Sequence, residues 1–287
     1  MENIVKQGRF FFAIAILAFG IENLVCARFG QAVVPVIPWV TKPIFAYLVG
    51  AAFIATALSI AANKMARLAA IFLGVLLLLC LLAFQLSGAI ASPLNLGIRT
   101  IVFETLSMCA AAWTLAGMLP AERHYSPLWE HVEDKLIKSG RYLFAISSVI
   151  FGIAHFLVPR FIASLIPTWI PGSGLFWAYF TGAAFVATGI SFVAAGISPA
   201  TNWMARWAGA LLGTMFLLWF LCLHAPRVMS FPKSHNPNEW SSAFIALGMC
   251  GGSWICAWAL SAKAVRNESP ARHQQAMYET SSSSVQM

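Results

Sequence analysis

Long apolar runs, separated by short polar or proline-rich segments, form the main pattern along the chain. Eight runs approach the roughly 20 residues that a helix needs to cross about 30 Å of hydrocarbon. They lie at residues 10–27, 44–62, 66–86, 98–118, 142–158, 174–196, 203–224 and 240–262. The runs lack the alternation of barrel strands, and a backbone in lipid must satisfy its own hydrogen bonds. The sequence therefore predicts an all-α membrane protein with eight transmembrane helices.

The first four runs return, in recognisable form, as the last four. The matched segments, at offsets that grow from 132 to 141 residues, are 8–9 with 140–141, 47–59 with 179–191, 65–67 with 204–206, and Trp113 with Trp254. Each copy holds four predicted spans, so both copies enter the membrane from the same side, as a parallel repeat does. The sequence thus predicts two parallel-repeat four-helix bundles.

The repeat divides the chain into four parts. The first four-helix repeat covers residues 1–119 and the second covers residues 140–262. Between them, residues 120–139 mix charged and apolar side chains, which is typical of an amphipathic helix at a membrane surface. Residues 263–287 are polar and serine-rich, so we expect a disordered tail.

Composition supports a membrane protein and excludes a nucleic-acid-binding one. Sixty per cent of the residues are hydrophobic and ten per cent are charged, whereas about a quarter are charged in soluble domains. The net charge is +8, but the basic residues are scattered singly and form no basic stripe. Twelve Lys and Arg residues fall on the side of the amino terminus and six on the other. This asymmetry predicts that both termini are cytoplasmic, in a bacterial inner membrane.

Only two carboxylates lie within the predicted spans, at Glu22 and Glu104. An ionisable residue at the centre of a transmembrane helix costs about 2.5–3.5 kcal/mol, so each needs a functional or structural reason. Both lie in the outer third of their helices, where further polar residues gather. The candidate ligand-binding residues are Glu22, Asn23, Gln85 and Glu104 in the first copy, and His155 and His224 in the second.

Two interpretations of these residues remain open. In the first, they line an outward-opening pocket for a small polar or redox-active ligand, with a glutamate as proton acceptor and His155 as a group that changes charge. In the second, Glu22 and Glu104 pair with Arg28 or Arg99, and His155 bonds a neighbouring helix. No nucleotide loop, zinc motif or nucleophile elbow is present, so no catalytic residue is assigned and no metal site is predicted. The six cysteines lack metal-ligand spacing and are interpreted as buried thiols.

Several strings in the second copy resemble the DoxX family of small four-helix bacterial membrane proteins. They are Phe-Gly-Ile-Ala-His-Phe-Leu-x-Pro-x-Phe at 151–161, Leu-Ile-Pro-x-Trp-Ile-Pro at 165–171, Tyr-Phe-Thr-Gly-Ala-Ala at 179–184 and Leu-Gly-x-x-Gly-Gly at 247–252. The chain therefore resembles a tandem duplication of the DoxX unit. The first copy departs from this pattern, because Glu22-Asn23 stands where the pattern has Ala-His.

The resemblance implies a redox role. The family is similar to DoxD subunits of thiosulfate:quinone oxidoreductase, and some members take part in thiol and oxidative-stress assemblies. Our leading hypothesis is a membrane component of a quinone- or thiol-linked redox assembly, with quinone as cofactor and redox proteins as partners. We expect such a component not to act as a stand-alone enzyme. The alternatives are a small-solute permease or ligand-binding membrane protein, and a non-catalytic membrane scaffold.

Overall fold

The computed structural model describes residues 6–27, 43–120, 127–230 and 239–260. Its α-helices are α2 (Gly8–Cys26), α3 (Pro43–Ala62), α4 (Ala66–Cys80), α5 (Leu86–Ala91), α6 (Leu96–Ala116), α7 (Pro127–Leu157), α8 (Pro159–Leu165), α9 (Gly174–Ile197), α10 (Asn202–Trp219) and α11 (Ala225–Ser230). The last helix is Glu239–Leu260. The π-helical segments η1 (Leu81–Gln85) and η3 (Phe220–His224) and the 3-10 turn η2 (Pro199–Thr201) complete the described elements.

Eight helices in the described ranges are long and apolar enough to cross a membrane. Each overlaps one predicted run, and the described residues form no strand. The prediction of an all-α, multi-pass membrane protein is confirmed. Three observed spans extend well beyond the predicted runs. The third continues through α5, the fifth already begins at Leu128, and the seventh continues through α11.

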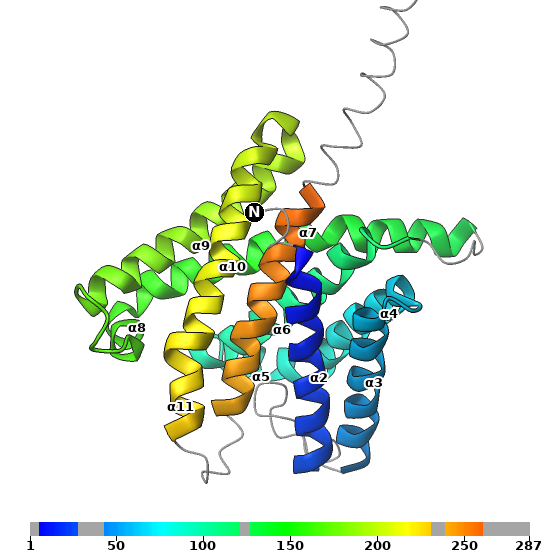
Figure 1. The fold of residues 1–287 in the computed structure, drawn as a ribbon, viewed down its shortest axis with the longest axis horizontal. Coiled ribbons are helices and arrows are strands. Elements are labelled where there is room, and N and C mark those ends of the chain that lie inside the picture. The colour runs from blue at the N-terminus through cyan, green and yellow to red at the C-terminus, as the bar shows by residue number, and fades with distance from the viewer. Residues whose placement is uncertain (1–5, 28–42, 121–126, 231–238, 261–287) are drawn as a thin grey trace, which may run out of the picture.

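The long helices form a row with two further helices across it. In Figure 1, α2, α3, α10 and the orange last helix run in roughly one direction, and α7 and α9 cross them. Helix α2 packs on α3, α7 packs on α9, and α6 packs on both α4 and α7. The end of α7, the segment η3 and the beginnings of α6 and the last helix lie together around α8, because they line common cavities. We call this the α8 end.

The last helix forms the centre of the core. Of the membrane-crossing stretch of this helix, 78% is buried inside the protein, more than for any other described span. Glycines allow this burial, because a Cβ atom at Gly251 would lie 2.5 Å from the Phe12 backbone nitrogen. Small residues let helices approach closely in lipid, where packing must replace the hydrophobic drive.

Glycines at matched sequence positions make matched contacts. A Cβ atom at Gly20 would lie 2.8 Å from the Gly50 carbonyl oxygen, and one at Gly152 would lie 2.6 Å from the Gly182 carbonyl oxygen. All four residues obey the 132-residue offset of the sequence repeat. The two helix pairs α2–α3 and α7–α9 are therefore packed through the same residues.

A second matched contact joins the two halves of the chain. A Cβ atom at Gly8 would lie 2.8 Å from the Gly251 carbonyl oxygen, and one at Gly140 would lie 2.7 Å from the Ala110 carbonyl oxygen. The first helix of each half thus packs on the fourth helix of the other half. The division into two bundles at residues 1–119 and 140–262 stays a prediction, and these contacts join the two predicted units.

The two π-helical segments also occupy matched positions. Segment η1 ends at Gln85 and η3 ends at His224, 139 residues later. A π-helical turn widens the helix locally and is often found at functional sites. The polar residue of each third helix therefore lies where the regular helix is interrupted.

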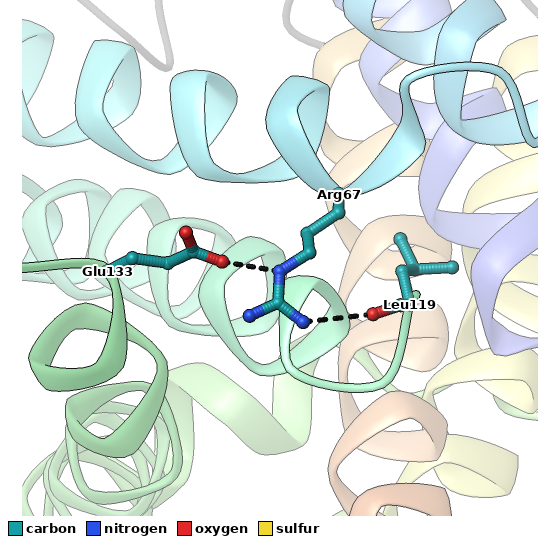
Figure 2. A network of polar contacts seen from close by, with 3 residues as sticks. All are labelled: Arg67, Leu119 and Glu133. Carbon is teal, nitrogen blue, oxygen red and sulfur yellow. Dashed lines mark hydrogen bonds and ion pairs between the residues drawn. The ribbon is translucent and has the colours of Figure 1, made fainter. Parts of the chain in front are cut away.

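Residues 127–139 of the predicted linker are part of α7, which continues without a break through the fifth span. The helix has 31 residues, or about 46 Å at 1.5 Å per residue, and so exceeds the hydrocarbon thickness. Figure 2 shows Arg67 of α4 between Glu133 of α7 and the Leu119 carbonyl group. Arg67 forms an ion pair with Glu133 and donates a 3.0 Å hydrogen bond to the Leu119 oxygen. Linker residues 121–126 and the tail at 263–287 lie outside the described residues.

Candidate functional site

Two adjoining cavities open near the α8 end, between α6, α7, α8, α10, η3 and the last helix. Their volumes are about 640 and 530 Å³. They share lining residues, among them Glu104, Phe161, Phe216, Trp219 and Ile245, so we treat them as one space, the Glu104 cavity. The 530 Å³ part is the aromatic part, and the 640 Å³ part is the serine part because Ser241 and Ser242 line it.

Glu104 enters this cavity from α6, which belongs to the first half of the chain. The side chain is half-buried and lines both parts of the cavity. Among the described residues, none forms an ion pair or hydrogen bond with the Glu104 carboxyl group, so the alternative that Glu104 pairs with Arg99 is not observed. Arg28, the other expected partner, lies outside the described residues. The carboxyl group is therefore available to a ligand in the cavity.

His155 of α7 lines the aromatic part and has a fixed orientation. The residue is 7% exposed, and its Nδ1 lies 2.8 Å from the Phe151 carbonyl oxygen. Its ring stacks on Trp219 with centroids 6.0 Å apart and an interplanar angle of 17°, and it contacts Phe185 at 5.2 Å. Nε2 is buried and has no hydrogen-bond partner among the described residues. An unsatisfied buried acceptor is costly, so this atom points to a missing ligand group.

A glycine on α9 makes room for His155. A Cβ atom at Gly182 would lie 2.9 Å from the His155 Cβ atom. The equivalent pair in the first half is Gly50 and Asn23, at 3.1 Å. The repeat therefore places His155 and Asn23 at the same position against the neighbouring helix. This position holds an imidazole ring in the second half and an amide group in the first.

The serine part of the cavity carries His224 and Ser241. His224 lies at the end of η3, and its Nδ1 is buried without a hydrogen-bond partner in the described ranges. The Ser241 hydroxyl group donates a 2.5 Å hydrogen bond to Oε1 of Glu22. Glu22 therefore reaches the cavity wall through Ser241.

The remaining candidates lie in the interior of the first half. Gln85 is 1% exposed, and its Nε2 donates a 2.8 Å hydrogen bond to Oγ1 of Thr105. Asn23 is 2% exposed and faces Gly50. Among the described residues, the lining of the Glu104 cavity includes neither. The structure thus brings Glu104, His155 and His224 to one cavity. Glu22 contacts the wall of this cavity through Ser241. Asn23 and Gln85 are not part of its lining.

Sequence reasoning missed Ser241 and the aromatic wall. Trp219, Phe185 and Phe216 pack edge to face around the cavity, with centroid distances of 5.4–6.1 Å. In a sequence this rich in aromatic residues, no local signal separates a cavity wall from lipid contact. The pair Ser241-Ser242 did carry a signal, because it interrupts an apolar run where the last helix begins.

The arrangement offers no metal centre or disulfide in the described part of the chain. No three His, Cys, Asp or Glu residues are grouped there in a way that would hold a metal ion. All six cysteines, which lie in the described ranges, are free thiols, and four of them are buried. The chemistry that this site supports is hydrogen bonding and proton exchange with a ligand in a largely apolar space.

Comparison with known proteins gives a family match in the second half of the chain. A model described as "Domain of unknown function (DUF8561)" matches residues 144–248. No curated protein and no solved structure matches the chain. The matched segment runs from α7 into the last helix and includes His155, Trp219 and Ser241, but neither Glu22 nor Glu104. The second half is thus similar to a family without an assigned function, and the carboxylates come from outside that similarity.

Proposed function

We propose that the protein is a membrane component of a quinone-linked redox assembly and that the Glu104 cavity binds the quinone. The observation that carries this proposal is the buried Nε2 of His155 in an aromatic cavity that Glu104 also lines. Neither Nε2 nor the Glu104 carboxyl group has a hydrogen-bond or ion-pair partner among the described residues. Polar groups at this depth in a membrane protein are costly unless they are satisfied. A ligand ring with two oxygen substituents, in its quinone or hydroquinone form, offers polar atoms to these two groups.

The size and lining of the cavity support a ring-shaped, lipid-soluble ligand. Ligand pockets typically measure 300–1,000 Å³ and combine apolar walls with a few polar groups. The aromatic part, at about 530 Å³, has Phe151, Phe185, Phe216 and Trp219 in its wall. Aromatic side chains favour offset-stacked or edge-to-face contacts with a bound ring.

The residues of this chain would bind the ring and hold protons at its oxygen atoms. His155 and Glu104 are the two groups that can exchange protons with a ligand in the aromatic part. A bound ring would supply the redox chemistry, because its quinone form takes up two electrons and two protons and its hydroquinone form gives them up. Electrons pass to or from a partner protein of the assembly, in line with the DoxX resemblance of residues 151–171.

Photolabelling tests the proposal directly. The purified protein in lipid nanodiscs is irradiated with a short-tailed azido-quinone, and the labelled peptides are identified by mass spectrometry. We expect saturable labelling of α7 and of the α10–η3 segment, which an excess of unlabelled quinone suppresses. Labelling that does not saturate, or that spreads evenly over the lipid-facing helices, would falsify the proposal.

We also propose a bacterial inner-membrane location with both termini in the cytoplasm. The twelve-to-six distribution of Lys and Arg supports this orientation,. A carboxyl-terminal fusion to green fluorescent protein should fluoresce, and a fusion to alkaline phosphatase should be inactive. The reverse pair of results contradicts the orientation.

A small-solute permease is the second candidate, favoured by the Glu22–Ser241 contact and the Glu104 carboxyl group inside the spans. This function predicts proton-coupled uptake into proteoliposomes that is lost in Glu22→Gln. A scaffold without chemistry instead predicts that Glu22→Gln and His155→Ala fold normally and change only partner recovery. Saturable quinone labelling without uptake separates the leading proposal from both.

A further inference from the structure

His155 offers a hydrogen-bond acceptor to the cavity. The Phe151 carbonyl oxygen can only accept, so the contact at 2.8 Å places a proton on Nδ1. A neutral imidazole carries a single ring proton, and Nε2 is then a bare acceptor. Rotating the ring by half a turn would bring Cδ2 to the Phe151 oxygen and lose that bond, so the ring orientation is set by the same contact.

Packing keeps the His155 ring in this position. Trp219 stacks on one side of it, and Phe185 lies 5.2 Å away between centroids. The absence of a side chain at Gly182 lets α9 approach the His155 Cβ atom closely. Nε2 therefore has a fixed position in the cavity wall, and a ligand must approach it there to form a hydrogen bond.

The other polar side chains in the aromatic part do not form a hydrogen bond with His155 Nε2. Thr100 donates its hydroxyl hydrogen to the Leu96 carbonyl oxygen at 2.8 Å, and Glu104 carries a carboxyl group. Together with His155 and Trp219, whose indole N–H can donate, these are the polar side chains that line the aromatic part,. Quinone oxygens are acceptors only, whereas the hydroxyl groups of a hydroquinone donate. A quinone can accept from a donor in the wall but leaves His155 Nε2 unsatisfied, whereas a hydroquinone donates to Nε2 and can still accept.

We infer that the aromatic part of the Glu104 cavity selects ligands that donate a hydroxyl hydrogen bond to His155 Nε2, so that a hydroquinone binds in preference to its quinone. The inference rests on the proposed function for the ligand class and adds which form of the ligand the site holds. It also assigns His155 as the residue that distinguishes the hydroquinone from the quinone.

Competition among three ring-matched ligands tests this selectivity. The wild-type protein in nanodiscs, under anaerobic conditions, is labelled with the azido-quinone in the presence of a short-tailed benzohydroquinone, its quinone or its dimethyl ether. One neutral hydrogen bond corresponds to about a three- to tenfold difference in affinity. We expect the hydroquinone to compete at a concentration lower by about that factor than either of the other two.

Two variants identify the residue responsible. His155→Phe keeps an aromatic ring against Trp219 and removes the acceptor, so the hydroquinone should lose its advantage while the quinone competes as before. His131→Phe is the matched control, because His131 is exposed on the same helix and lines neither part of the cavity, and it should leave the advantage intact. An advantage that survives in a folded His155→Phe protein contradicts the assignment of His155.

The wild-type comparison decides the inference even if a variant fails to fold. A quinone that competes as well as the hydroquinone, or better, overturns the inference and leaves the proposed function standing. The same holds for a dimethyl ether that competes as well as the hydroquinone. No saturable competition by any of the three ligands overturns the proposed function and the inference together.

Discussion

The Ser241 hydroxyl group donates a 2.5 Å hydrogen bond to Oε1 of Glu22, although the two residues lie 219 positions apart in the chain. Ser241 is 2% exposed, and the bond joins α2 to the last helix beside the Glu104 cavity. A side-chain hydrogen bond contributes about 0.5–1.5 kcal/mol to stability, and up to about 3 kcal/mol when the acceptor is charged. This contact therefore ties the first half of the chain to the wall of a cavity built mainly by the second.

Removing the donor of this bond should destabilise the protein. For Ser241→Ala we expect a loss of about 1–3 kcal/mol in the free energy of unfolding, measured in mixed detergent micelles. Ser242→Ala is the control, since Ser242 lines the same part of the cavity, and its cost should stay within about 0.5 kcal/mol. A double-mutant cycle with Glu22→Ala should give a coupling energy above about 0.5 kcal/mol. Additive effects of the two substitutions would show that the bond does not form.

The ion pair between Arg67 and Glu133 should contribute more than the exposed pair on the same helix. The Glu133 side chain is 9% exposed, so Glu133→Gln leaves the Arg67 charge poorly compensated. We expect a cost of about 2–4 kcal/mol in the same unfolding measurement. In the pair Lys138–Asp134 the side chains are 72% and 54% exposed, and Asp134→Asn should cost less than about 1 kcal/mol. Equal costs for the two substitutions would contradict the packing of α7 against α4.

Glycine contacts between the halves should be intolerant of a methyl group. Gly140→Ala places a Cβ atom 2.7 Å from the Ala110 oxygen and Gly8→Ala places one 2.8 Å from the Gly251 oxygen, so each should cost about 1–3 kcal/mol. At Gly97 the nearest atom would be Asn95 Oδ1 at 3.3 Å. Gly97→Ala should therefore be close to neutral. If Gly8→Ala and Gly140→Ala differ widely, the two contacts are not equivalent.

Filling the aromatic part of the cavity should block ligand binding without loss of the fold. Ala154 lines this part, and Ala154→Phe should reduce saturable quinone labelling by about tenfold or more. Its neighbour Ile153 is 46% exposed, and Ile153→Phe should label as the wild type does. The unfolding free energies of both variants, measured in parallel, separate blocked binding from misfolding. Normal labelling of a folded Ala154→Phe protein would place the ligand elsewhere.

The sequence predicts the spans well because their length is set by the bilayer and not by the rest of the fold. The junction at Gly140 was harder to predict. This glycine looks like a helix boundary in the sequence, yet it lies inside α7, where it lets the helix approach the Ala110 oxygen. A close approach between helices and a helix end both use glycine, and the sequence does not separate them.

The candidate site was predictable only in part. Polar residues inside apolar runs identified Glu104, His155 and His224, which the structure brings to one cavity. Helix geometry argues against the expected pair of Glu104 with Arg99, because residues five apart lie on different faces of a helix. The partner of Glu22 was not predictable, since no local pattern connects α2 to Ser241. Contacts between distant segments depend on how the helices assemble.

The contact of Gly8 with Gly251 has a consequence for biosynthesis. Helix α2 leaves the ribosome before the helix that covers its glycine face, which is the last membrane-crossing helix described. At 5–20 residues per second, translation reaches Gly251 about 10 to 50 seconds after Gly8. Until then the face of α2 that carries Gly8 and Phe12 stays uncovered in the bilayer, where it is exposed to lipid or to the insertion machinery. Truncation before the last helix would therefore yield a nascent chain that quality-control proteases can recognise as unfinished.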